Sequence, residues 1–121
     1  MIVTKEQVLA AARYVAELRQ VPMAIQLSYQ VSKLAYEIAH AEKKIMEERF
    51  EILKKHGYDG SEDFVFPEEK IEVINSEIAA MLGEEIEIPA AAINLSSLLE
   101  LNIQVPPVFL DVIMPFTEGE L

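Results

Sequence analysis

The residues between Pro22 and His56 form the longest stretch of the chain without an internal glycine or proline. At about 1.5 Å per residue, a helix here would be a rod of roughly 50 Å, too long for a chain of 121 residues to cover by itself. Its apolar side chains recur mostly at intervals of three and four residues, so they share one narrow helical face. We call this face the ladder, and it consists of Leu27, Val31, Leu34, Ile38, Ala41, Ile45 and Ile52. The ladder predicts a partner helix, from the same chain or from another copy.

The composition predicts one folded domain over residues 1–121. Hydrophobic residues make up 51% of the chain, which is enough to bury a core. No apolar run approaches the roughly 18–20 residues of a membrane span, and the first residues lack a secretory pattern. The absence of cysteine excludes disulfides and thiolate metal sites and fits a reducing compartment. We therefore expect a cytoplasmic protein that contacts no membrane.

The net charge of −11 is unevenly distributed. All ten Lys and Arg residues lie within residues 1–70, whereas residues 71–121 hold nine acids and no cation. The simpler interpretation is a solubilising surface that keeps like-charged copies apart. The alternative is a negative surface for a basic partner, as in an acidic mimic of nucleic acid. Direct binding of DNA or RNA is not expected, because phosphates need a clustered basic face.

Helix signals flank the long segment on both sides. Thr4 and Gln7 form a capping-box pattern at the start of a first helix. Pro22 breaks that helix and suits the first turn of the next one. Gly57 ends the long helix, and Pro67 begins a third one that should pair with it as an antiparallel hairpin. The expected helices cover about 4–20, 22–56 and 67–82.

The remaining segment, 84–121, is expected to form a mixed tail. Glu85–Ile88 alternates polar and apolar residues, which predicts a short strand. Val108–Met114 is a candidate for a last short helix. The predicted fold class is therefore mainly α, a long helical hairpin with an N-terminal helix and a short mixed α/β C-terminal tail.

Two further patterns lie on the long helix. Met46, Phe50 and Leu53 form a second apolar stripe, which predicts that this end of the helix is buried on two sides. Opposite charges four residues apart predict a solvated outer face. These pairs are Lys33 with Glu37, Lys43 with Glu47, Lys44 with Glu48 and Glu51 with Lys55.

No catalytic signature is present in the sequence. It has no serine-centred elbow, glycine-rich phosphate loop or HExxH motif. Glu37 and His40 have the spacing of half a di-metal carboxylate site, but such a site needs a second half and two further glutamates. We expect a solvated helix face there, with no metal, no cofactor and no enzyme activity.

Four residues form a candidate ligand site, because aromatic rings beside cations can stack on a nucleotide and neutralise it. They are Arg19, Tyr29, Lys33 and Tyr36. A small oligomeric chain with such a site could sequester a nucleotide-type defence signal. The simpler interpretation, which we favour, is that the tyrosine rings edge the core with their hydroxyl groups in water.

The chain combines an N-terminal helix with an amphipathic segment (32–57), the sequence FPEE (66–69), the sequence MLGEEIEI (81–88) and a hydrophobic close that contains MPF (114–116). In this order of parts it resembles a group of small bacteriophage proteins, the domain-of-unknown-function family 1617. The resemblance covers nearly the whole chain and implies a phage or prophage protein acting inside a bacterium. It carries over no active site.

We therefore expect a non-enzymatic phage-type protein that acts through protein–protein contacts, as an oligomeric assembly factor or as an inhibitor of a host system. The nucleotide sponge and the acidic mimic are the alternatives. The expected partner is a second copy, most simply in a two-fold dimer held by the ladder, together with a host or phage protein. The expected location is the cytoplasm of the bacterial host.

Overall fold

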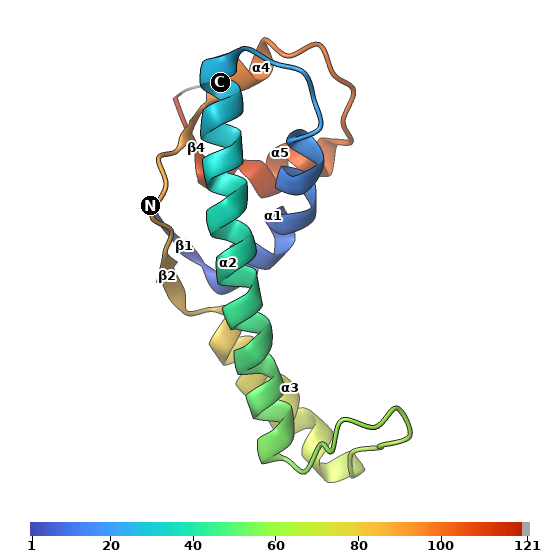
Figure 1. Ribbon diagram of the computed structural model, residues 1–121. Helices are drawn as coiled ribbons and strands as arrows, with labels where there is room; N and C mark the ends of the chain where they lie inside the picture. Colours follow the sequence, from blue (N-terminus) through green and yellow to red (C-terminus); the bar gives the residue numbers. More distant parts are fainter. Residues whose placement is uncertain (120–121) are drawn as a thin grey trace.

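A computed structural model describes residues 1–119, and its main feature is one long helix, α2 (Ile25–Lys55), which runs nearly the full height of the molecule (Figure 1). Helix α1 (Lys5–Leu18) packs along its upper half, and α3 (Glu68–Leu82) lies beside its lower half. The short helices α4 (Leu95–Leu99) and α5 (Pro107–Ile113) belong to the upper part. The fold is mainly helical with a strand-containing tail, which confirms the predicted fold class.

Two small sheets tie the ends of the chain to this framework. The strands are β1 (Ile2–Thr4), β2 (Glu85–Glu87), β3 (Ile93–Asn94) and β4 (Thr117–Glu118). Strand β1 pairs antiparallel with β2, and β3 pairs parallel with β4. The strand expected at 85–88 is thus confirmed, and its partner is the start of the chain. A 3₁₀ turn, Met114–Phe116, follows α5, and the tail expected over 84–121 is described as far as Gly119.

The starts of α1 and α2 differ in how well local signals define them. The Thr4 hydroxyl accepts a hydrogen bond from the Gln7 N–H (3.1 Å), and the Gln7 side chain accepts one from the Thr4 N–H (2.9 Å), so the predicted capping box is present. The long helix begins at Ile25, not at Pro22 as expected. Pro22 follows the turn that the hydrogen bond from the Val21 N–H to the Leu18 carbonyl closes at the end of α1. The chain needs these residues to reverse direction before α2 can run back along α1.

The ladder of α2 faces the core. Val15 of α1 and Leu95 and Phe116 of the tail belong to the same hydrophobic cluster. The seventh ladder residue, Ile52, is half-buried against that cluster, and the other six are buried within the single chain. The buried six are Leu27, Val31, Leu34, Ile38, Ala41 and Ile45. The structure therefore corrects the expected role of the ladder as a self-association surface, because α1 and the tail already cover it.

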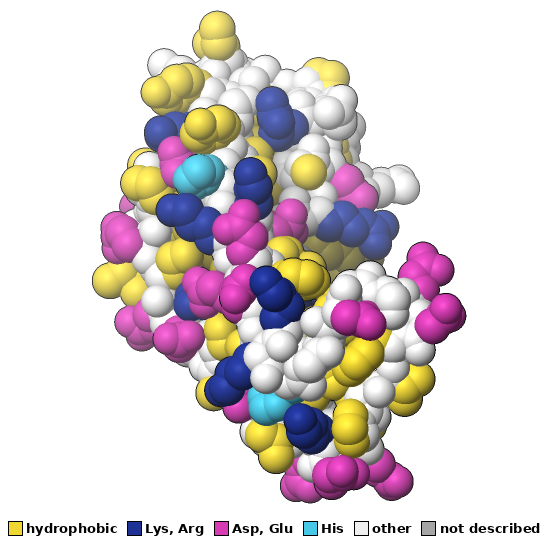
Figure 2. Space-filling model, turned by 60° about the horizontal axis from the view of Figure 1, so that its bottom comes forward, with side chains coloured by type: hydrophobic (Ala, Val, Ile, Leu, Met, Phe, Trp, Pro, Cys, Tyr) yellow, Lys and Arg dark blue, Asp and Glu magenta, His cyan; other side chains and the backbone are white. Residues whose placement is uncertain are grey.

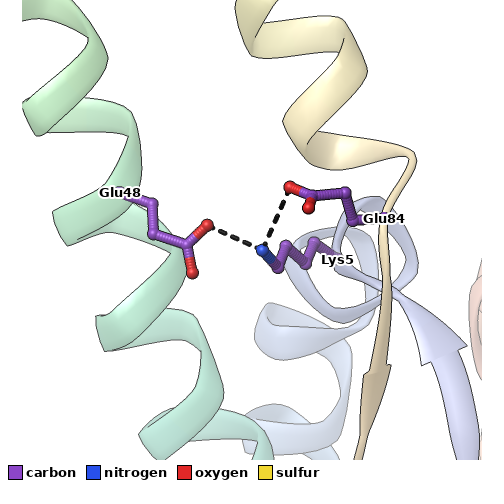
Figure 3. Close-up of polar contacts among 3 residues, drawn as sticks. All are labelled: Lys5, Glu48 and Glu84. Carbon is purple, nitrogen blue, oxygen red and sulfur yellow. Dashed lines mark hydrogen bonds and ion pairs between the residues drawn. The ribbon is translucent and has the colours of Figure 1, made fainter.

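Lys5 fixes α2 against its neighbours. Its Nζ donates to Glu48 Oε2 of α2 (2.7 Å) and to Glu84 Oε1 (3.3 Å), two residues beyond α3 (Figure 3). The Lys5 side chain is largely buried, and the hydrogen bond to Glu48 is the main cause that raises its pKa. This cluster joins α1, α2 and the segment after α3, so it helps to determine which side of α2 faces outward.

Candidate protein interface on the outer face of α2

One side of α2 is exposed along most of its length. Its residues recur at alternating intervals of four and three, which is the spacing of a helix face that can pack against another helix. We call this row the outer stripe, and it consists of Ile25, Tyr29, Ser32, Tyr36, Ala39, Lys43, Met46 and Phe50. Every member is exposed, and the row extends over roughly 40 Å of helix.

The outer stripe lies almost opposite the ladder. Tyr29 stands two residues from Leu27 and two from Val31, and both of those ladder residues are buried. Tyr36 has the same position between two other buried ladder residues. Two residues turn a helix by about 200°, so side chains at this spacing point to opposite sides. The inner face of α2 thus builds the core, while the outer face meets solvent.

Large side chains make up much of the outer stripe. Tyr29 is 72% exposed, Tyr36 is 67% exposed, and Ile25 is exposed at the start of the helix. Tyrosine is enriched in protein interfaces, where its ring buries apolar area and its hydroxyl group keeps a hydrogen bond. Figure 2 shows hydrophobic groups interspersed with basic and acidic side chains on the molecular surface. An apolar row bordered by charges is typical of a helix that packs against another helix.

The C-terminal end of the outer stripe is open on one side. Met46 and Phe50 are 45% and 43% exposed, so the prediction that this end is buried on two sides is wrong for both. Leu53 is half-buried. The Phe50 ring contacts Tyr58 edge-on with 5.8 Å between centroids, and Tyr58 stacks on Phe66 at 6.1 Å. The connector between α2 and α3 therefore supports one side of Phe50 and leaves the other accessible.

The four residues of the candidate ligand site do not form one pocket. Tyr29, Lys33 and Tyr36 lie along the exposed side of α2, where the Lys33 Nζ donates to Glu37 Oε1 (3.1 Å). Arg19, just after α1, lines a separate groove between α1 and α2 that includes neither tyrosine. The two rings are also too exposed to edge the core, so the interpretation favoured from the sequence does not describe them.

The ion pairs along α2 differ from those expected. Among residues 1–119, the Lys33–Glu37 pair is the one formed of the four predicted. Glu48 instead reaches Lys5 of α1, and Lys55 reaches α3. These cross-element pairs fasten the sides of α2 next to the core and leave the outer stripe free of them.

Several acids of the cation-free half of the chain have structural partners. Glu84 pairs with Lys5, and Glu87 lies 3.2 Å from the N-terminal amine. Glu77 of α3 pairs with Lys55 at 3.2 Å. Part of the acidic surface therefore holds the two halves of the chain together.

The expected half of a di-metal site, Glu37 and His40, lies on α2. Glu37, one member of the expected half-site, is engaged by Lys33. Within residues 1–119, no group of three or more His, Cys, Asp or Glu side chains is placed to hold a metal ion. No helix in the described range is both long and apolar enough to cross a membrane.

The sequence prediction captured only one end of the outer stripe, at Met46 and Phe50. The complete row is harder to see because Ser32, Ala39 and Lys43 interrupt its large apolar residues. The row is recognisable by its alternating intervals of four and three residues, which are displaced by two positions from the residues of the ladder. The Lys5 cluster has no comparable signal, since its members lie far apart in the sequence.

A scan against protein-family models, a search of the curated proteins and a search of the solved structures each found no match. The resemblance to the bacteriophage family stays a prediction from the order of parts in the sequence.

Proposed function

We propose that this chain is a non-enzymatic phage-type protein that works through protein–protein contacts made by the outer stripe of α2. In the cytoplasm of a bacterial host it acts as an oligomeric assembly factor or as an inhibitor of a host system. The supporting observation is an exposed row of apolar and tyrosine side chains on a helix whose opposite face already forms the core. One buried face is enough to stabilise an amphipathic helix, so the fold itself does not require the second row.

Tyr29 and Tyr36 are the expected anchors of this surface. Tyrosine is one of the residue types that carry most of the binding energy of protein interfaces, and truncating such an anchor costs about 2 kcal/mol or more. Both rings project from a rigid helix, so little conformational entropy is lost when they are covered.

Affinity purification from bacterial cells tests this function. Tagged wild-type protein is compared with Tyr36→Asp and with Val73→Asp, a control that places the same charge on the exposed side of α3. We expect one or more bacterial or phage proteins to be retained by the wild type and the control and to be lost from Tyr36→Asp. Equal retention by all three proteins, or retention by none, contradicts the proposal.

A second candidate function is the sequestration of a nucleotide-type signal. Its support is the exposure of two tyrosine rings on either side of Lys33. Calorimetry with cyclic di- and trinucleotides tests it, with Tyr29→Ala as the variant expected to lose the binding heat. The absence of heat with every member of the panel excludes this function for those ligands.

A further inference from the structure

We propose that the occupant of the outer stripe is α2 of a second copy of this chain, running antiparallel about a two-fold axis level with Ala41. This inference rests on the proposed function and names the first partner of the same surface. It replaces the ladder, which is buried, with the opposite face of the same helix as the contact between copies. A two-fold contact of this kind is self-complementary: where one residue meets a second residue of the partner, that second residue meets the partner's copy of the first.

The sizes of the side chains favour the antiparallel arrangement. In antiparallel helix pairs, positions of one helix pack in layers against positions of the other, and small residues accommodate large ones. The layers are Tyr29 with the partner's Leu53, Ser32 with the partner's Phe50, Tyr36 with the partner's Met46, and Ala39 with the partner's Lys43. A parallel arrangement would instead pair each residue with itself, which places two Lys43 side chains together and leaves Ser32 facing Ser32.

The charges that border the stripe favour the same arrangement. Lys33 lies one position beyond Ser32, and Glu47 lies one position beyond Met46, so both are on the same border of the stripe. The antiparallel pairing places Lys33 opposite the partner's Glu47, and the two-fold axis repeats this contact. Glu42 faces the partner's Glu42 near the axis. Measured along the helix axis, Lys43 of each copy lies within about 4.5 Å of both of these glutamates.

The exposed area of the stripe is suited to a dimer of modest size. A tyrosine side chain buries about 150–250 Å² when it is covered. Four rings at 67–72% exposure would supply roughly 550 Å², a third of the ~1,600 Å² that a standard interface buries. The remaining stripe residues and their charged borders provide the rest of the contact.

Charge reversal with sedimentation tests the inference. Lys33→Glu and Glu47→Lys each place like charges opposite one another twice, so each is expected to raise the dimer dissociation constant about tenfold. The double variant Lys33→Glu/Glu47→Lys restores the contact and returns the constant close to that of the wild type. The controls Lys70→Glu and Glu72→Lys make the same charge changes on the exposed side of α3 and leave the constant unchanged.

Two outcomes overturn the inference. A wild-type chain that stays monomeric over a dilution series removes the second copy as the occupant. If the wild type dimerises but the single and double variants raise the dissociation constant equally, the antiparallel contact is rejected. The affinity experiment is independent of both outcomes. If Tyr36→Asp loses a host protein and the wild-type chain is monomeric, the proposed function remains in place and only the second copy is rejected as the occupant.

Discussion

At the residue scale, a few polar side chains determine how α2 is held. Lys5 begins α1, where the positive end of the helix dipole disfavours a cation, and its two glutamate partners offset that cost. At the far end of α2, His56 Nε2 and Lys55 Nζ each lie 3.2 Å from Glu77 Oε1 of α3. Each cluster joins α2 to elements that are distant in the sequence.

Glu77 gives the fold a predicted acid sensitivity. The close approach of His56 Nε2, and then the hydrogen bond from Lys55, lowers the pKa of its carboxyl group below the ordinary 4.5. Because the folded state favours the ionised carboxylate, this contribution to stability is complete at pH values above the ordinary pKa. It is lost as the pH falls through the lowered pKa of the folded state. We expect the stability difference between wild type and Glu77→Gln, measured by urea denaturation, to shrink between about pH 5 and pH 2. A difference that does not change with pH over this interval argues against the ion pair.

The capping box makes a second prediction at this scale. Thr4→Ala removes the hydroxyl that accepts from the Gln7 N–H, so it should lower the free energy of unfolding by about 1 kcal/mol. Ser76→Ala, which removes an exposed hydroxyl within α3, serves as the control and should be nearly neutral. Equal effects of the two substitutions in chemical denaturation would contradict the role of the cap.

At the scale of elements, α2 has two faces with separate roles. The ladder packs against α1 and the tail, whereas every member of the outer stripe is exposed. Ile38→Ala should therefore lower the free energy of unfolding by about 3 kcal/mol through a cavity in the core. Tyr36→Ala, two residues away on the exposed side, should cost less than about 1 kcal/mol in dilute protein. Chemical denaturation measures both, and similar losses would mean that the two faces are not separate.

The sequence allowed the elements to be predicted where their signals are local. The periodicity of the ladder and the positive-φ residue Gly57 marked α2 and its end, and the capping box marked the start of α1. A periodic pattern shows that a helix has an apolar face but not what covers it. Here the cover includes Phe116, and strand β1 depends on the pairing of Ile2 with Glu87, 85 residues away. Such distant contacts have no local signature.

The candidate interface was predictable only in part for the same reason. The sequence of the long helix contains two rows of residues at intervals of mostly four and three, and it favours the richer row as the contact between copies. Core formation selects the row that is richer in aliphatic side chains, because burying it gains more free energy. The row left outside, with Tyr29 and Tyr36, is the one available to a partner.

At the scale of the whole molecule, the chain forms a body around the upper end of α2 and a hairpin of α2 with α3 at the lower end (Figure 1). Antiparallel pairing through the outer stripe would place the lower end of each copy beside the upper part of the other. Dimer and monomer would then share the same core, so the association would depend on protein concentration without requiring unfolding.

The distance between two spin labels tests this arrangement most directly. The chain has no cysteine, so Gln26→Cys provides a single labelling position at the exposed border of the outer stripe. Pulsed electron resonance should report a separation of roughly 45 Å along the paired helices, because the two labels stand at opposite ends of the contact. A separation near 10 Å would indicate parallel helices, and the absence of coupling at dimer-forming concentration would indicate that the outer stripe does not meet a second copy.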